Sequence, residues 1–428
     1  MFKVKNMSAL KKKIELMNFF FIILLFFFIP LFKHITVWLL ILFITNTFII
    51  ADYKSKYNEL KISRSSAYIV LFSFIYILYI LGLVNTSNTE YAFFDLEVKL
   101  SIFLLPIVFF LIDNVYFSKE FIKKCFLAYL LGVSVNVIIC LAIAFYNFFI
   151  IYHSYNVFFY SSLSKFFHPS YLSMYLNFAV IILLFASSSG VILFNMQKYI
   201  SIVLQIFFSI IIFLLSSKAG IISLIFIYLF YILFNIFSQK KYKIGLLTLV
   251  VLIFGTILLL KVLPFVKDRF TVASYAIKNN SNAIKSDGES NADRIIIWGI
   301  SVNIIKQNLL FGVGTGDVKD VLLNEYKRNE IDFAYKKKLN AHNQYLQTFI
   351  ALGLPGIIVF LLCFLLPIIF SIKHHYYLYL MFLFLFAFNI LVESMFENQA
   401  GVVFYALMNS FLFFSRYHLS AVKSLKIK

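Results

Sequence analysis

Long apolar runs, separated by short polar segments, fill most of the 428-residue chain. A helix needs roughly 20 consecutive apolar residues to cross a membrane, and most of the runs approach that length. We therefore predict an all-α polytopic membrane protein with about 12 transmembrane helices. The predicted spans are residues 17–32, 35–51, 67–84, 98–113, 124–151, 171–188, 199–215, 219–237, 244–263, 345–371, 376–392 and 401–416.

One polar segment is much longer than the others and lies between the ninth and tenth spans. Within it, Asp293 follows the candidate N-cap Ser290 by three residues and precedes a run with helical apolar spacing, which predicts a helix. The stretch GDVKDVLLNEYKRNE predicts a second helix, at the surface. We expect three parts: residues 1–263 with nine spans, residues 264–344 as an extracytoplasmic loop with short helices, and residues 345–428 with three spans and a tail.

Lys and Arg are unevenly distributed among the polar segments. With the N-terminus placed inside, the inner segments hold 21 of the 38 basic residues, and the short outer segments hold four. Cytoplasmic loops collect Lys and Arg, whereas long loops cross the membrane regardless of their charge. We therefore expect both termini in the cytoplasm and the long loop on the outer side.

Composition supports the membrane class and argues against others. Hydrophobic residues make up 62% of the chain and charged residues 13%, against roughly 45–50% and 25% on average. Basic residues in the predicted cytoplasmic loops explain the net charge of +19, so we expect no nucleic-acid partner. Cys125, Cys140 and Cys363 are scattered and indicate neither a disulfide framework nor a metal site.

Ionisable residues are almost absent from the predicted spans, and unusual polar residues collect at their outer ends instead. A transporter keeps such groups near the middle of the membrane, whereas a site at the outer boundary suits a substrate with a lipid tail and a polar head. The residues at these outer ends are His168, Lys218, Arg294, His342, Asn343, Glu393, Glu397 and Gln399.

Three of these residues have both a chemical and a structural interpretation. His342 is either a general base or an inert histidine at a helix end. Arg294 lies in the first turn of the predicted loop helix, with Trp298 one turn later, and is either a phosphate ligand or a solvated residue. Lys218 separates two spans with almost no loop and either binds an anion or extends to the interface.

Two glycine-containing segments lie close to these residues. FGVGTGD, with Gly312 and Gly314, lacks the Lys-Ser/Thr of a Walker loop and the strand–helix setting of a dinucleotide fingerprint, so it predicts a tight turn between two loop helices. Gly353 and Gly356 allow close helix packing, and Pro355 predicts a kink or a helix start.

In this order, the motifs resemble those of the O-antigen ligase and O-antigen polymerase superfamily. His342-Asn343, followed nine residues later by Gly353-Leu-Pro-Gly356, is similar to the signature of that superfamily. The upstream stretches RIIIW and LLFGVGTGD, which contain Arg294, Trp298, Gly312, Gly314, Gly316 and Asp317, resemble its outer loop.

Two further segments extend the resemblance over roughly residues 165–399. FFHPSYLSMYL contains His168, and ESMFENQAG contains Glu393, Glu397 and Gln399. The chain departs from the common pattern at Lys218, where arginine is usual, and near Leu309, where a proline is frequent. Because lysine offers a point charge and no planar fork, the departure at Lys218 weakens its assignment to phosphate.

The resemblance implies a metal-independent, inverting glycosyltransferase without a cofactor, in the inner membrane of a bacterium. Its donor would be a glycan on undecaprenyl pyrophosphate. The acceptor hydroxyl would belong to lipid A–core in a ligase, to a second lipid-linked glycan in a polymerase, or to a protein in some relatives. Arg294 and Lys218 would hold the pyrophosphate, and His342 would orient or deprotonate the acceptor at the periplasmic face. The remaining assignments are substrate binding by Asn343, His168, Glu393, Glu397 and Gln399, and structural roles for Gly312, Gly314, Gly353, Gly356 and Trp298.

Two other classes stay open from the residues alone. A flippase for lipid-linked oligosaccharides, or another transporter, would carry polar residues at mid-depth on several helices. A scaffold would have no enclosed cavity near His342. For an enzyme, we expect the long loop to cover the outer end of the bundle and to bring Arg294 within reach of His342 and Lys218.

Overall fold

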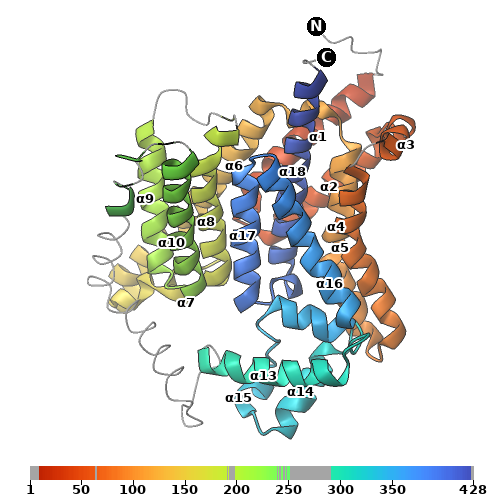
Figure 1. Ribbon diagram of the computed structural model, residues 1–428. Helices are drawn as coiled ribbons and strands as arrows, with labels where there is room; N and C mark the ends of the chain where they lie inside the picture. Colours follow the sequence, from red (N-terminus) through yellow and green to blue (C-terminus); the bar gives the residue numbers. More distant parts are fainter. Residues whose placement is uncertain are drawn as a thin grey trace.

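The computed structural model describes residues 9–62, 65–189, 191, 198–238 and 291–425, together with residues 240, 242, 243, 246 and 248–250. Within these residues every regular element is a helix, which confirms the all-α prediction (Figure 1). A helix satisfies its own backbone hydrogen bonds where no water is present, and long apolar runs therefore fold this way in lipid.

The helices before the long loop are α1 (Ala9–Phe28), α2 (Lys33–Ile50), α3 (Tyr53–Ile62), α4 (Ser65–Leu81), α5 (Thr89–Leu111), α6 (Lys119–Tyr146), α7 (Tyr160–Leu163), α8 (Pro169–Phe185), α9 (Lys198–Leu214) and α10 (Lys218–Leu233). Three loop helices follow, namely α13 (Asn291–Gln307), α14 (Val318–Arg328) and α15 (Asp332–Lys336). The chain ends with α16 (Gln344–Lys373), α17 (Tyr377–Val392) and α18 (Gln399–Leu425).

The predicted spans agree well with these helices. Eleven of the twelve coincide with a helix, and the ninth, residues 244–263, lies largely outside the described residues. By length and composition, five helical segments can cross a membrane: residues 33–50, 66–85, 119–152, 218–237 and 344–373. The helices α8, α9 and α17 are equally apolar in character but shorter.

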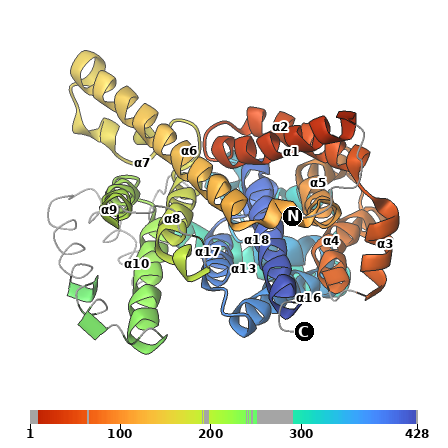
Figure 2. The ribbon, with the colours of Figure 1, turned by 90° about the horizontal axis from the view of Figure 1, so that it is seen from above.

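The bundle is held together by its central helices. α18 packs against α5, and α17 packs against both α16 and α8. Seen from above, α17 and α18 lie between the group α1–α5 and the group α8–α10 (Figure 2). Buried rings fill this centre, with Phe382 against Phe404 and Phe386 against Tyr405. Since lipid is as apolar as these side chains, ring packing rather than hydrophobic burial supplies the attraction between helices.

The two ends of the bundle differ. α1 begins and α18 ends at one end, whereas α13, α14 and α15 cover the other (Figure 1). The first loop helix was predicted from the apolar spacing after Asp293 and is α13, although its candidate cap Ser290 lies outside the described residues. α14 is the predicted second helix, and FGVGTGD forms the predicted turn between the two.

The helix α16 is bent at Gly353, whose backbone φ of 63° and ψ of −154° are not helical. Pro355 contributes to the bend because proline has no N–H and cannot donate to the carbonyl of Ala351. That carbonyl instead accepts a hydrogen bond from the backbone N–H of Gly314, at 3.0 Å. The predicted kink is therefore present, and the glycine turn supplies the donor that proline lacks.

Two more backbone hydrogen bonds join the glycine turn and the residues just before it to the bend in α16. The N–H of Val313 donates to the carbonyl of Ile350 at 2.8 Å, and the N–H of Leu354 donates to the carbonyl of Leu309 at 2.9 Å. The chain segments approach so closely that a Cβ on Gly312 would lie 2.5 Å from a carbonyl oxygen of the bend. We call residues 309–317 and the bend at residues 350–354 the glycine clasp.

Asp317 ties the glycine clasp to the segment between α4 and α5. Its carboxylate accepts hydrogen bonds from the backbone N–H groups of Ser87, at 2.8 Å, and Asn88, at 2.7 Å. The Gly316 N–H donates to Thr86 Oγ1 at 3.2 Å. The long loop is thus fastened to both the first and the last thirds of the chain, which fixes where α13 lies.

Candidate functional site

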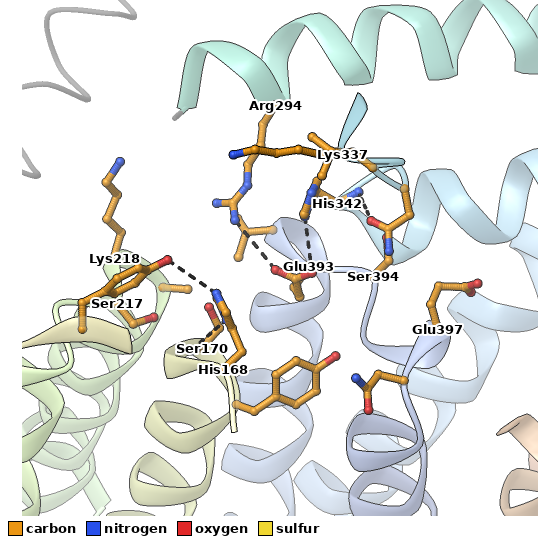
Figure 3. Close-up of a pocket in the computed structure, with 17 residues that line it drawn as sticks. His168, Ser170, Ser217, Lys218, Arg294, Lys337, His342, Glu393, Ser394 and Glu397 are labelled. Carbon is orange, nitrogen blue, oxygen red and sulfur yellow. Dashed lines mark hydrogen bonds and ion pairs between the residues drawn. The ribbon is translucent and has the colours of Figure 1, made fainter. Parts of the chain in front are cut away.

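One pocket gathers most of the polar residues singled out by the sequence. It has a volume of about 360 Å³, and α13 runs across it (Figure 3). Six segments form it: α7, the start of α8, the start of α10, the start of α13, the loop before α16 and the segment after α17. The lining residues are Tyr160, His168, Ser170, Tyr171, Ser217, Lys218, Ala219, Arg294, Lys337, Leu339, Asn340, His342, Val392, Glu393, Ser394, Glu397 and Asn398.

The pocket unites residues that lie far apart in the sequence. Of the eight residues predicted to act on substrate, Asn343 and Gln399 are outside the lining. The six inside it are His342, Arg294, Lys218, His168, Glu393 and Glu397. The expected juxtaposition of Arg294, Lys218 and His342 is therefore present in this structure.

His342 occupies a conformation that histidine rarely adopts. Its φ of 45° is in the left-handed region, which costs a residue with a Cβ roughly 1–2 kcal/mol. Its N–H is held by Asn340 Oδ1 at 3.0 Å, and its Nδ1 lies 3.3 Å from Glu393 Oε1. Its Nε2 is buried and has no hydrogen-bond partner among the described residues. The ring thus contacts a carboxylate through one nitrogen and has the second nitrogen left for another group.

Glu393, directly after α17, joins His342 to Arg294. Its Oε2 lies 3.8 Å from Arg294 Nη2, while its Oε1 faces His342. Burial alone raises the pKa of the Glu393 carboxyl, but its contacts with His342, Arg294 and His168 lower that pKa to a net value below the usual range. The carboxylate is therefore ionised near neutral pH and can hold both a histidine and a guanidinium.

His168 is the N-cap of α8 and faces the pocket from the opposite wall. Its Nδ1 accepts a hydrogen bond from the Ser170 N–H at 3.3 Å, and its Nε2 lies 3.4 Å from the Tyr160 hydroxyl. The capping bond requires a lone pair on Nδ1, so the proton of a neutral ring is on Nε2. The side chain positions both Tyr160 and the helix start.

Several helices begin at the pocket. α8, α10, α13 and α16 start within a few residues of His168, Lys218, Arg294 and His342. At α10, Ser217 caps the helix by accepting from the Gly220 N–H at 3.3 Å, and Lys218 is the first helical residue. The N-terminus of a helix carries partial positive charge and unsatisfied N–H groups, which favour anions. Together with the cationic side chains, this arrangement suits a phosphate group.

A third cation at the pocket was not singled out by the sequence. Lys337 is one of three consecutive lysines, and no pattern distinguishes it from Lys336 and Lys338. It follows α15, and its side chain extends across the pocket beside Arg294 (Figure 3). The loop before α16 therefore contributes a cation as well as His342.

Asn343 lies beside the pocket and forms part of its framework. Its Oδ1 accepts hydrogen bonds from the N–H groups of Tyr345, at 2.9 Å, and Leu346, at 3.2 Å, and so caps α16. Its own N–H donates to Ser394 Oγ at 3.1 Å. The structure thus shows a capping role for Asn343, where the sequence suggested contact with substrate.

The two glutamines of the same stretch have comparable positions. Gln344 Oε1 accepts a hydrogen bond from the Phe396 N–H at 2.7 Å, and Gln347 Oε1 accepts one from the Ala341 N–H at 3.2 Å. Both side chains are buried. The polar cluster at the start of α16 therefore holds the backbone on either side of His342 and connects it to the segment after α17.

The remaining predicted residues lie elsewhere. Gln399 lines a separate small crevice with Lys33 and Phe167. Trp298 packs partly buried against the core, outside the pocket lining. Gly356 faces the Leu352 side chain within α16, and the other motif glycines belong to the glycine clasp.

A comparison with known families gives a match over the middle of the chain. The sequence profile of a family described as O-antigen ligase matches residues 202–361. Over these residues the chain is similar to the O-antigen ligase and polymerase superfamily. No curated protein matches the chain. This match indicates an O-antigen ligase or polymerase type of function, and therefore a glycosyltransferase-like enzyme that acts on lipid-linked glycans. The long apolar helices indicate a multi-pass membrane protein.

The matched region accounts for only part of the pocket. Lys218, Arg294 and His342 lie inside residues 202–361. Glu393 and His168, which complete the pocket, lie outside the match and are brought in by α17 and α8. The fold, rather than the matched segment alone, therefore assembles the site.

Proposed function

We propose that this protein moves a glycan from undecaprenyl pyrophosphate to an acceptor hydroxyl, with lipid A–core as the acceptor. The observation that supports it most directly is the pocket in which Arg294 and Lys218 lie with the His342–Glu393 pair. We place the pocket at the periplasmic face of a bacterial inner membrane and both termini in the cytoplasm. On this proposal residues 264–344 form the extracytoplasmic loop.

The cationic side of the pocket receives the donor. A diphosphate leaves readily once fixed cations neutralise its charge, and fixed cations need no reorganisation during the reaction. Arg294 offers a planar fork for two phosphate oxygens, and Lys218 offers a point charge at the start of α10. Lys337 is close enough to the pocket to add a third positive charge.

His342 then acts on the acceptor. In this mechanism Glu393 holds the proton on Nδ1, which leaves the lone pair on Nε2. Nε2 takes the proton of the acceptor hydroxyl while the oxygen attacks the anomeric carbon. The bond from that carbon to the diphosphate oxygen breaks, and the electron pair leaves with undecaprenyl diphosphate. Attack from the face opposite the leaving group inverts the anomeric centre, and no metal is required.

Polymerisation is the alternative within the same family, because a second lipid-linked glycan can supply the hydroxyl. Deleting the gene and separating the surface polysaccharide on a gel distinguishes the two. Loss of all long chains from lipid A indicates a ligase, and a single repeat unit on lipid A indicates a polymerase. Transfer by the purified protein, from the lipid diphosphate donor to lipid A–core, tests the proposal itself. Absence of transfer to either acceptor, with movement of the donor across vesicles, would instead indicate a flippase.

A further inference from the structure

A buried lysine lies beneath the acceptor side of the pocket. The Lys99 side chain is fully buried. Its Nζ forms ion pairs with Asp95, one turn earlier on α5, and with Glu397 Oε1 at 3.1 Å. The ring of Tyr79 lies 4.8 Å from the same ammonium group. Two carboxylates and an aromatic ring thus surround a single cation.

Burying such a cluster of charges costs free energy of desolvation. Removing each charge from water costs several kcal/mol, and well-packed apolar residues of similar volume are often equally stable. Stability alone therefore gives little reason for the cluster. One of its members is also part of the pocket, because Glu397 is a lining residue and Asp95 is not.

Glu397 lies on one side of His342, and Lys218 lies on the other. Figure 3 shows Lys218 at the left of the pocket, His342 and Glu393 in the centre, and Glu397 at the right. An ionised carboxylate repels a diphosphate, whereas it accepts hydrogen bonds from sugar hydroxyls. The two sides of the pocket therefore suit different parts of the reaction.

The segment that carries Glu397 is fixed relative to His342. Gln344 Oε1 accepts from the N–H of Phe396, the residue before Glu397, and Ser394 Oγ accepts from the N–H of Asn343, the residue after His342. Gln344 Nε2 also donates to Thr348 Oγ1, which lies 3.3 Å from the Tyr79 hydroxyl. These hydrogen bonds thus hold the residue after His342 and the residue before Glu397, and they extend to Tyr79, whose ring lies beside Lys99.

We propose that Glu397 is the acceptor-sugar subsite, in which its carboxylate accepts a hydrogen bond from a hydroxyl next to the one that attacks. Lys99 is a positioning residue whose ion pair with Glu397 keeps this carboxylate directed into the pocket. The inference rests on the proposed glycosyl transfer. It assigns the specificity for the acceptor to Lys99 on α5 and to Glu397 in the segment after α17. The donor diphosphate occupies the opposite side.

The test measures transfer with donor and acceptor varied separately, using purified undecaprenyl-diphosphate-linked glycan and lipid A–core from a host that lacks its ligase. Glu397→Gln should raise KM for the acceptor about tenfold or more, since it weakens a charge-assisted hydrogen bond, and should leave the Kd for the donor unchanged. Asp95→Asn is the matched control, because it removes the other carboxylate of Lys99 from outside the pocket. It should leave KM for the acceptor within about twofold of the wild type.

Lys99→Gln should reproduce the rise in KM, and the double variant with Glu397→Gln should show no further rise, as expected for residues that act as a unit. If Lys99→Gln does not fold, comparing KM for the acceptor between Glu397→Gln and Asp95→Asn still tests the subsite. Equal acceptor KM values for that pair would overturn the subsite, and weaker donor binding in Glu397→Gln would move Glu397 to the donor side. Lack of transfer by the wild type would contradict the proposed function itself.

Discussion

Two regions at the loop-covered end of the bundle, the pocket and the glycine clasp, both contain residues of the superfamily pattern but have opposite physical character. In the pocket, Arg294, His342 and Glu393 are charged or titratable and contact one another through side chains. In the glycine clasp, Gly312 and Gly353 contribute backbone alone, and their neighbours are carbonyl oxygens. The pocket residues contribute reactive or charged side chains. The glycines of the clasp leave room for backbone segments that a side chain would keep apart.

The clasp nonetheless determines the geometry of the pocket. It links the end of α13 to the bend in α16, while Arg294 lies near the start of α13 and His342 lies directly before α16. A change in the clasp should therefore alter stability first and activity as a consequence. A change in the pocket should alter activity and leave stability nearly unaffected.

The largest effect is expected for His342→Ala, which should lower turnover by about 10²–10⁴-fold, the usual contribution of a general base. Thermal unfolding should change little because no core packing is lost. His375→Ala is a matched control, since His375 is also left-handed, with φ 52°, but lies in the turn between α16 and α17. Turnover of His342→Ala above about a tenth of the wild type would exclude this histidine as the base.

Gly353→Ala should destabilise the protein by about 2–4 kcal/mol, because alanine disfavours φ 63° and its Cβ would lie 2.4 Å from the Leu310 carbonyl oxygen. Gly299→Ala, on α13, is the control, since a Cβ there meets no atom within 4 Å. It should be neutral or stabilising by about 0.5–1 kcal/mol. Unfolding in detergent measures both, and equal stabilities would contradict the role of the clasp.

Arg294→Lys should reduce transfer by about 10- to 150-fold although charge is kept, because losing one charge-assisted hydrogen bond costs about 1.5–3 kcal/mol. Lys218→Arg should be tolerated, since the fork retains the charge and adds donors. Steady-state kinetics with the lipid diphosphate donor measures the pair. Wild-type activity in Arg294→Ala would remove this arginine from the mechanism.

Asn343→Ala should lower stability by about 0.5–2 kcal/mol through loss of the α16 cap and should reduce turnover less than His342→Ala does. Asn343→Ser keeps a capping oxygen and should recover most of the stability. If serine restores folding but activity stays as low as in the alanine variant, the asparagine amide contacts substrate directly.

The smallest expected effect is the dependence of protein stability on acidic pH through Glu393. The pKa of Glu393 is lowered from 4.5 in the folded protein, so its ionised form stabilises the fold above about pH 4.5, and this contribution is lost as pH falls through the folded pKa. The stability difference between wild type and Glu393→Gln should therefore shrink below about pH 4.5. A difference that is constant from pH 7 to pH 3 would show that the charge of Glu393 is not involved.

The local pattern predicted the helices because a long apolar run in lipid satisfies its backbone hydrogen bonds within the run itself, as a helix. The sequence runs 171–188 and 376–392 correspond to α8 and α17 within a few residues. The resemblance to the superfamily also rested on residues whose spacing is local, such as His342-Asn343. Such local patterns can be recognised in the sequence without knowing which elements pack beside them.

Long-range pairing could not be read in this way. The buried ion pair of Lys99 and Glu397 joins two residues that are 298 positions apart in the chain. The donor that Gly314 provides for the bend in α16, and the bond from Gln344 to Phe396, likewise join separate elements. Neither periodicity nor composition encodes such contacts, because packing of the whole bundle creates them.

Equilibrium binding of the lipid diphosphate donor to Arg294→Ala and His342→Ala tests the division of labour in the pocket most directly. Arg294→Ala should bind the donor at least about tenfold more weakly, since it loses a fixed cation and its hydrogen bonds. His342→Ala should bind the donor with the affinity of the wild type and still fail to transfer the glycan. Equal losses of donor affinity in both variants, or none in either, would contradict the assignment of the cations to the diphosphate and of the histidine to the acceptor.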